Sequence, residues 1–233
     1  MINLLAYTDP SKNFDGEEAK VMAKIQIDNA LDLGWKREDI LIATDFEYEY
    51  NGIKSIVVED KNPITWNLTQ GKIVSITQLF AKNLIKEGQL YWFHDFDAFQ
   101  LEPFSKGDLK LSDLDIGLTN SGRRMFNGGS FFFNHKARDI FDWTMDRIYK
   151  EHLDEELSFA HLASTGELNM KNRYKLMDHT YNLGIDNFPQ NYESAQKPIR
   201  VAHFHPHKRR HMNLFRDILP QRFLKIFERY GIA

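Results

Sequence analysis

Two aspartates, Asp95 and Asp97, are the residues whose type and spacing indicate chemistry most directly in this sequence of 233 residues. They follow an apolar run, 90–93, and a single residue separates them, so in extended backbone their side chains point the same way. Two carboxylates held this close raise each other's pKa unless a cation lies between them. Mg²⁺ and Mn²⁺ prefer oxygen ligands and meet that need. The pair therefore predicts a divalent-metal site, and the alternative is a solvated turn after a strand.

A histidine cluster about a hundred residues further on offers another ligand. The segment 201–211 reads VAHFHPHKRRH and holds four histidines and three basic residues. If the segment is a strand, His203 and His205 lie on one face. The alternative interpretation is a basic surface loop that binds metal or nucleic acid weakly.

The composition limits the chemistry that such sites can carry. The chain has no cysteine, which excludes disulfides, zinc–thiolate sites, iron–sulfur clusters and cysteine nucleophiles, so a metal must bind to oxygen and imidazole. Its 30 Lys and Arg against 33 Asp and Glu give a net charge of −3, which argues against a nucleic-acid partner bound through bulk charge. No apolar run approaches the ~18 residues of a membrane span, and the first residues lack the basic start of a signal peptide. We expect a cytoplasmic protein with no transmembrane segment.

The elements that must position these residues alternate between strands and helices. Apolar runs predict strands at 2–7, 40–44, 55–58, 90–93, 116–119, 129–133, 174–177 and 199–204. Composition and apolar periodicity predict helices at 17–33, 73–84, 136–149, 154–162 and from about 214. The alternation predicts an α/β fold with a mixed, mainly parallel sheet flanked by helices, and residues 1–233 read as one domain. In such sheets ligands lie at the carboxyl ends of strands, where Asp95 and Asp97 are found.

A pair of glycines precedes one of the predicted strands. The segment 126–134 reads FNGGSFFFN, and glycine allows a ligand or another backbone to approach closely. Arg123 and Arg124 come directly before it and are placed to engage a phosphate. The alternative is a hairpin turn of the Asn-Gly type. We favour the ligand-binding interpretation.

The string YWFHDFDAF at 91–99, followed about thirty residues later by FNGGSFFFN, resembles the nucleotide-sugar-dependent glycosyltransferases of the GT-A fold. In that family an Asp-x-Asp motif after a strand holds a metal on the diphosphate of the donor, and an Asn-Gly-Gly segment lines the sugar site. The resemblance implies a Rossmann-like GT-A domain and a hexosyl- or pentosyltransferase with Mn²⁺ or Mg²⁺ as cofactor. Its donor would be a UDP- or GDP-linked sugar, and its acceptor a glycan, a lipid-linked molecule or another hydroxyl compound.

The resemblance also implies roles for individual residues. The metal ligands would be Asp95, Asp97 and His203, with His205 as the alternative to His203. The donor nucleotide would be bound by residues at the end of the first strand, an aromatic residue of the motif and two lysines: Tyr7, Thr8, Asp9, Phe96, Lys72 and Lys208. The donor or acceptor sugar would be bound by Asn127, Gly128, Gly129, Asp178 and His179.

An inverting transfer also needs a carboxylate that takes the proton of the acceptor hydroxyl. In related enzymes an acidic residue that opens a helix after the Asn-Gly-Gly strand has this role, and the helix start here offers Asp154, Glu155 and Glu156. We favour Glu155. The alternative is that these acids only complement the helix dipole. The segment lacks the Asp-Gln pattern, followed by Asn, of retaining enzymes, which favours inversion.

Two other classes of function fit parts of the sequence. Metal-dependent phosphohydrolases that form an aspartyl-phosphate also carry Asp-x-Asp after a buried strand. Their pair lies on the first strand of the chain and is followed by Thr or Val after one residue, whereas Ala98 and Phe99 follow here. A non-catalytic carbohydrate-binding or nucleic-acid-binding module would use the aromatic residues and the basic segment. The two motifs together favour the glycosyltransferase.

Overall fold

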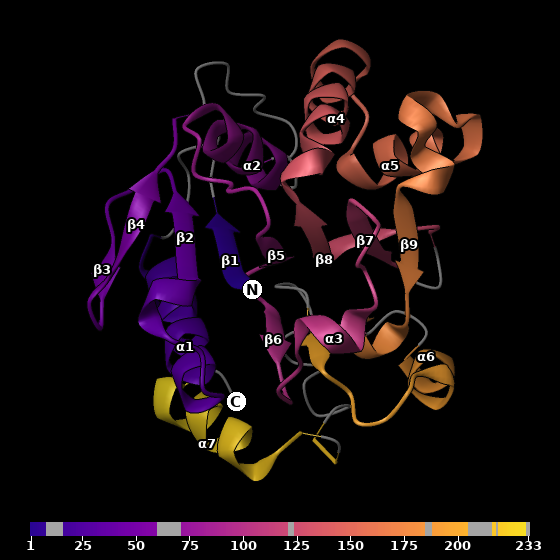
Figure 1. Cartoon of the computed structure of the whole chain (residues 1–233). Helices are drawn as coiled ribbons and strands as arrows, with labels where there is room; N and C mark the ends of the chain where they lie inside the picture. Colours follow the sequence, from indigo (N-terminus) through magenta and orange to yellow (C-terminus); the bar gives the residue numbers. More distant parts are fainter. Residues whose placement is uncertain are drawn as a thin grey trace.

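A sheet of eight strands forms the centre of the molecule, and helices cover both of its faces (Figure 1). The computed structural model describes residues 1–7, 16–59, 71–120, 124–184, 188–204, 216–217 and 219–231. The strands are β1 (Ile2–Tyr7), β2 (Ile40–Thr44), β3 (Glu49–Tyr50), β4 (Ile53–Val57), β5 (Leu90–His94), β7 (Ile116–Thr119), β8 (Asn127–Asn134) and β9 (Tyr174–Met177). Their order in the sheet is β3-β4-β2-β1-β5-β8-β7-β9.

The direction of the strands brings several strand ends to one edge of the sheet. β1 is parallel to β2 and β5, and β2 is parallel to β4. β8 runs antiparallel to both β5 and β7, and β9 is parallel to β7. The carboxyl ends of β1, β5, β7 and β9 therefore meet the amino end of β8. The Asp-x-Asp and Asn-Gly-Gly motifs consequently lie at the same edge, as ligand sites of such sheets do.

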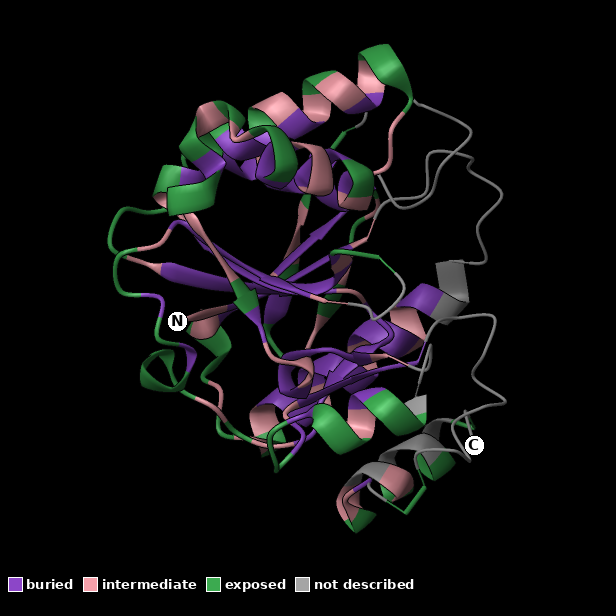
Figure 2. Cartoon of the chain, turned by 90° about the vertical axis from the view of Figure 1, so that its right-hand side faces the viewer, coloured by how far each residue is buried: buried purple, intermediate pink, exposed green. Residues whose placement is uncertain are grey.

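Helices form a layer on each side of this sheet (Figure 2). They are α1 (Gly16–Asp32), α2 (Gly71–Ala81), α3 (Lys106–Leu109), α4 (Arg138–Glu151), α5 (Glu155–Thr165), α6 (Phe188–Ser194) and α7 (Gln221–Tyr230). Short 3₁₀ helices cover Arg37–Asp39, His135–Ala137, Glu167–Asn172 and His179–Tyr181. Residues of α2, α4 and α5 share one hydrophobic core with the sheet, whereas α1 belongs to the core on the opposite face. Among the described residues, no helix is long and apolar enough to cross a membrane.

The aromatic residues of β5 and β8 are divided between the two faces by the alternation of side chains along a strand. Phe93, Phe131 and Phe133 are fully buried in the core under α2 and α4. Trp92 and Phe132 point to the other face, where they are buried as well. The run of three phenylalanines after the glycine pair is therefore core.

A second, small sheet packs with α1 on one face of the first sheet and contributes His203 to the site. Its order is β10 (Leu183–Gly184), β11 (Val201–His203) and β6 (Ala98–Gln100). β6 begins one residue after Asp97 and runs antiparallel to β11, so that Ala98 lies opposite His203. The backbone amide of Phe204 also donates to the carbonyl of Asp97 at 3.0 Å.

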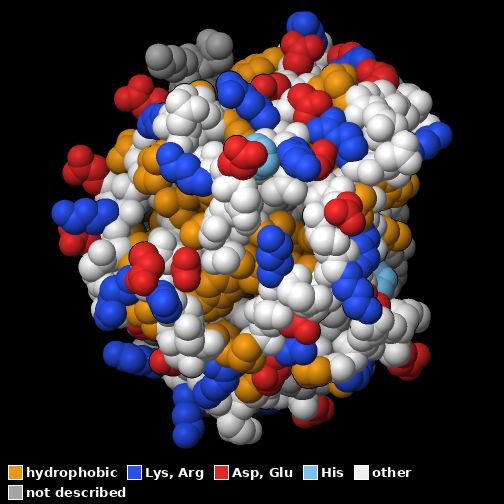
Figure 3. Space-filling view, viewed as in Figure 1, with side chains coloured by type: hydrophobic (Ala, Val, Ile, Leu, Met, Phe, Trp, Pro, Cys, Tyr) orange, Lys and Arg blue, Asp and Glu red, His pale blue; other side chains and the backbone are white. Residues whose placement is uncertain are grey.

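The predicted α/β fold and mainly parallel sheet are confirmed, and four predicted strands, β1, β2, β7 and β9, have the predicted bounds. Sequence patterns missed β3, β6, β10, α3 and α6, which are all short, and predicted β11 as a longer strand. The predicted C-terminal helical segment from about 214 begins in the structure as α7 at Gln221. On the face shown in Figure 3, acidic and basic side chains are interspersed, as the nearly balanced charge suggests.

Candidate functional site

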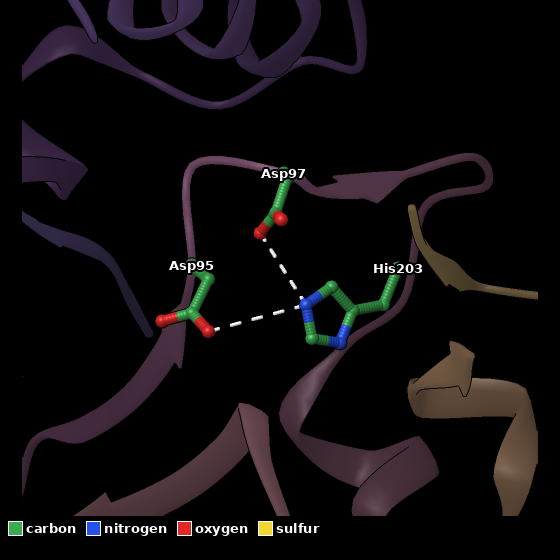
Figure 4. Close-up of side chains that lie close together, drawn as sticks. All are labelled: Asp95, Asp97 and His203. Atoms are coloured by element: carbon green, nitrogen blue, oxygen red, sulfur yellow. Dashed lines mark ion pairs between the residues drawn. The ribbon is translucent and has the colours of Figure 1, made fainter. Parts of the chain in front are cut away.

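Three side chains from two distant segments meet at the carboxyl edge of the sheet: Asp95, Asp97 and His203 (Figure 4). The imidazole Nε2 of His203 lies 3.3 Å from Asp97 Oδ1 and 4.0 Å from Asp95 Oδ2. The three candidate ligand atoms lie within 4.8 Å of one another. His203 and Asp97 are buried, whereas Asp95 is half-buried. The structure thus brings together the three residues that the sequence predicts as metal ligands.

The turn after β5 holds the two aspartates in place. The amide of Asp95 donates to the carbonyl of Gly129 at 2.9 Å, and the amide of Ala98 donates to the carbonyl of Asp95 at 3.0 Å. The buried side chain of His94 bridges the turn, because its Nδ1 lies 2.8 Å from the carbonyl oxygen of Ala98. Burial lowers the pKa of His94 to about 4, so the ring is neutral at pH 7. His94 is a positioning residue that sequence reasoning missed.

The glycine pair makes room for two ionisable side chains. A Cβ atom on Gly129 would lie 2.1 Å from Cε1 of His203, and one on Gly128 would lie 2.5 Å from Oε1 of Glu155. Neither distance is tolerable between non-bonded heavy atoms, whose attraction is greatest at about 3.5–4.0 Å. The two glycines also lie in a bulge, since the pairing of β7 with β8 passes from Leu118–Phe131 directly to Thr119–Asn127. Glycine is required here by the close approach of Glu155 and His203.

The charges of the three predicted ligands favour a cation between them. Burial lowers the pKa of His203, but the charge of Asp97 and the hydrogen bond to it outweigh burial, and the net pKa is raised. Desolvation raises the pKa of Asp95; Lys72 opposes that rise and the charge of Asp97 adds to it, and the net pKa is raised. Both groups therefore bind a proton more readily than usual, as expected at a site with an excess of negative charge.

This donor set fits a divalent metal ion. Carboxylates suit Mg²⁺ and Mn²⁺, and imidazole is a common ligand of transition metals, so Mn²⁺ matches both kinds of ligand. The absence of a side chain on Gly129 allows the His203 ring to lie against the backbone with its Nε2 toward both aspartates (Figure 4). Asp95, Asp97 and His203 are the residues that would hold the ion.

Lys72, near the start of α2, joins this group to the start of α5. Its ammonium lies 3.0 Å from Asp95 Oδ2, 3.1 Å from Glu155 Oε1 and 3.0 Å from the carbonyl of Gly128. Burial lowers its pKa, but the carboxylates of Asp95 and Glu155 outweigh that effect, so the net pKa is raised and the ammonium stays charged. Lys72 is thus the counter-ion of two carboxylates, and the predicted contact with a donor phosphate would have to replace one of these three partners.

The three acids predicted as candidate bases have different surroundings. Asp154 is the N-cap of α5, where it accepts from the amide of Leu157, and it also pairs with Arg124 at 2.6 Å. Glu156 accepts from the amide of Gly128 at 3.0 Å and pairs with Arg124 at 3.1 Å. Glu155 alone of the three is buried beside Lys72. Arg124, predicted to engage a phosphate, holds Asp154 and Glu156 in this structure.

An asparagine that sequence reasoning missed, Asn182, lies beside the predicted sugar-binding residue Asn127. Its Nδ2 lies 2.7 Å from Asn127 Oδ1 and 2.8 Å from Thr119 Oγ1. Asn127 Oδ1 also accepts from the amide of Gly129 at 2.9 Å. Asn182 is buried and precedes β10, the neighbour of β11 in the small sheet. The sequence offered no signal for it, because a single asparagine between two short elements reads as a loop residue.

The remaining predicted residues lie at the same edge or outside the described residues. Tyr7 ends β1, and its ring packs against Phe96 with centroids 5.4 Å apart. Asp178 follows β9, and its Oδ1 accepts from the amides of Thr180 and Gln196, while His179 opens the next 3₁₀ helix. Five predicted residues lie outside the described residues: Thr8, Asp9, Arg123, Lys208 and the alternative ligand His205.

Solved structures of glycosyltransferases have the same fold as this chain. It is similar to a glycosyltransferase involved in the glycosylation of the major capsid of PBCV-1, with 12% identity and a TM-score of 0.60 over 92% of this chain and 100% of that one. It is similar to the galactosyltransferase LgtC, solved with donor and acceptor sugar analogues, with 14% identity and a TM-score of 0.56 over 99% and 95% of the two chains. For GlyE of Streptococcus pneumoniae TIGR4 the identity is 13% and the TM-score 0.61, over 98% of this chain and 63% of GlyE.

No protein-family model matches the sequence, and no curated protein sequence matches it significantly. At identities of 12 to 14%, the likeness to these solved structures establishes the fold. The chain has the GT-A fold, which the resemblance of its two motifs implied.

Proposed function

We propose that this protein is a metal-dependent glycosyltransferase that moves a sugar from a nucleotide-sugar donor to a hydroxyl group of a glycan, a lipid-linked molecule or another acceptor. The observation that carries the proposal is the convergence of Asp95, Asp97 and His203 at the carboxyl edge of a GT-A fold. The Asp-x-Asp motif and His203 are about a hundred residues apart in the sequence. The antiparallel pairing of β6 with β11 joins them in space.

The protein's own residues have distinct parts in the proposed reaction. Asp95, Asp97 and His203 would hold a divalent ion, which would supply Lewis-acid stabilisation of the negative charge on a leaving diphosphate. Lys72 neutralises the carboxylates of Asp95 and Glu155 and fixes their positions, since its ammonium contacts both. The Gly128–Gly129 backbone leaves the space that the side chains of Glu155 and His203 occupy. Lys208 is proposed to neutralise the diphosphate, and Tyr7 and Phe96 to bind the nucleotide.

Glu155 is the acid that we propose to take the proton of the acceptor hydroxyl in an inverting transfer. Asp154 and Glu156 are held by Arg124 and by backbone amides, whereas the second oxygen of Glu155, Oε2, has no hydrogen-bond partner among the described residues. The anomeric configuration of the first-formed product, read by ¹H NMR, tests this assignment. A product with the configuration of the donor would contradict it.

The proposed function is tested by thermal shift with UDP-, GDP- and dTDP-linked sugars, with and without Mn²⁺. We expect one nucleotide series to stabilise the wild type only with Mn²⁺, and Asp97→Asn to abolish this response. Asp113→Asn, which changes an exposed aspartate away from the site, is the matched control and should respond as the wild type does. No nucleotide response together with turnover of a phosphate ester would identify a phosphohydrolase instead. A shift with glycan or oligonucleotide that ignores Asp97→Asn would identify a binding module.

A further inference from the structure

The hydrogen-bond donors of Lys72 are all in use. An ammonium group has three N–H bonds. Lys72 directs them at Asp95 Oδ2, Glu155 Oε1 and the carbonyl of Gly128, at 3.0, 3.1 and 3.0 Å. Its side chain is only 8% exposed, so water does not compete for these bonds. A ligand in the sugar site therefore meets no unused donor on Lys72.

The orientation of Asn182 follows from a bond that can form in one way only. A backbone N–H can only donate, so the atom of Asn127 that meets the amide of Gly129 is an acceptor, Oδ1. The same oxygen faces Asn182, and the facing atom of Asn182 must then be its donor, Nδ2. Both N–H bonds of that group are used, on Asn127 and Thr119. The carbonyl oxygen of Asn182, Oδ1, is left pointing away from these partners.

Two buried acceptors are consequently left at this edge of the sheet. Asn182 Oδ1 and Glu155 Oε2 are both buried and have no hydrogen-bond partner within the part of the chain that the structure describes. They lie on either side of one short segment, because Asn182 contacts Asn127 while Glu155 lies against Gly128. A buried acceptor without a donor is destabilising, by about 1–3 kcal/mol. A hydroxyl group of a donor sugar and one of an acceptor would satisfy these two atoms.

We propose that the site takes a neutral donor sugar, one hydroxyl group of which donates to Asn182 Oδ1, and that it rejects donor sugars that carry a carboxylate; Glu155 Oε2 is left for the acceptor hydroxyl. This inference rests on the proposed function and adds to it a class of sugar and a specificity-determining residue, Asn182. A sugar hydroxyl is a donor and an acceptor at once, so it can meet an acceptor-only group. A carboxylate has no hydrogen to give, so one placed at Asn182 Oδ1 would set two acceptors against each other and leave this buried oxygen without a donor.

The test measures the contribution of the sugar separately from that of the nucleotide. The nucleoside diphosphate that binds most tightly with Mn²⁺ is chosen from UDP, GDP and dTDP. Its affinity is compared by calorimetry with those of its neutral hexose and of the corresponding uronate, for example UDP-glucose and UDP-glucuronic acid. We expect the uronate to bind at least tenfold more weakly than the hexose, which is the effect of about one lost hydrogen bond to a charged or buried group.

A pair of variants assigns the effect to Asn182. Asn182→Ala should lose most of the affinity gained from the hexose, while its affinity for the nucleoside diphosphate alone stays within twofold of the wild type. The matched control is Asn29→Ala, because Asn29 is a buried asparagine of α1 whose Oδ1 also has no partner among the described residues. Its Nδ2 donates to the carbonyl of Gln100, so it shares the burial of Asn182 but none of its contacts. This control should retain the preference for the hexose.

The outcomes separate this inference from the proposed function. If the nucleoside diphosphate binds with Mn²⁺ but the uronate binds as tightly as the hexose, the inference is overturned and the proposed function stands. The same holds if Asn182→Ala keeps the full preference of the wild type. If no nucleoside diphosphate binds with Mn²⁺, the proposed function fails, and the inference fails with it. The comparison of hexose with uronate on the wild type needs no variant, so it decides the matter even if Asn182→Ala does not fold.

Discussion

Replacing Gly129 by alanine should weaken metal binding strongly although it removes no ligand. The new Cβ would lie 2.1 Å from Cε1 and 2.2 Å from Nδ1 of His203. Since such contacts relax at about 3.5–4.0 Å, the ring has to retreat by about 1.5 Å. It has little room to do so, because His203 is 3% exposed and its strand β11 lies between β6 and β10.

The size of the effect follows from this displacement. A metal–nitrogen bond of about 2.1 Å does not survive a shift of more than ~1 Å, so one of the three protein ligands is lost. Loss of a partner that only orients a ligand already weakens metal binding about 10- to 100-fold. We therefore expect a fall of at least a hundredfold, about 3 kcal/mol, in the affinity for Mn²⁺. Overpacking should also reduce the free energy of unfolding by about 1–3 kcal/mol.

The measurement is titration calorimetry with Mn²⁺ at pH 7.5, on variants shown to be folded by circular dichroism. Gly117→Ala is the matched control, because Gly117 is also a buried strand glycine. A Cβ there would meet only the ends of two flexible side chains, Leu111 Cδ1 at 3.0 Å and Met177 Sδ at 3.1 Å. The control should bind Mn²⁺ as the wild type does. Wild-type affinity in folded Gly129→Ala would refute the claim that the glycine exists to seat His203.

Three further predictions concern stability and can be checked by urea unfolding. Lys72→Met leaves two carboxylates without their buried counter-ion and should lower the free energy of unfolding by about 3 kcal/mol or more; an unchanged value would show that Asp95 and Glu155 do not depend on Lys72. The guanidinium of Arg173 binds Asp115 at 2.6 Å and Asp139 at 2.7 Å, so Arg173→Met should lower the free energy of unfolding by about 2 kcal/mol. This loss should shrink in acid. The hydrogen bond from Arg173 lowers the pKa of Asp139, and the stabilisation disappears as Asp139 is protonated. The pKa of the buried His94 is lowered to about 4, so the side chain takes up a proton near pH 6.5 only when the protein is unfolded. The free energy of unfolding should therefore fall between pH 6.5 and 4, by about 2 kcal/mol at pH 5. Equal pH slopes for the wild type and His94→Gln would contradict this.

Much of the fold was predictable because its long elements carry strong local patterns. The strands β1, β2, β5 and β7 are predominantly hydrophobic, as buried strands of a parallel sheet are. α1 ends close to Gly34, whose φ of +89° suits glycine at a helix end. The short elements were not predictable, since β6 and β10 have three and two residues and no periodicity of their own. They exist because they pair with β11.

The candidate site was predictable in its residue types and not in its geometry. Asp95 and Asp97 stand out by their spacing, and His203 by the density of histidine around it. What joins them is the pairing of β6 with β11, a contact across about a hundred residues that no local pattern encodes. The glycine pair was predictable as a place of close approach. That Glu155 and His203 are the groups that approach depends on tertiary packing alone.

Asn182 shows the limit of sequence reasoning at this site most clearly. Its role depends on which atom of an amide faces which neighbour, and that is settled by a hydrogen bond between Asn127 and the backbone of Gly129. Neither the identity of Asn182 nor its place before β10 indicates this. The bond becomes visible only when β8 and the small sheet are placed side by side.

The most direct test of the central claim is the position of a bound ion. Crystals grown with Mn²⁺ and a nucleoside diphosphate should give an anomalous difference peak, measured at the manganese edge, in contact with the carboxylates of Asp95 and Asp97 and with Nε2 of His203. The nucleoside diphosphate should contact the same ion. A bound nucleotide with no manganese peak between these three residues, or a peak elsewhere in the molecule, would contradict the claim.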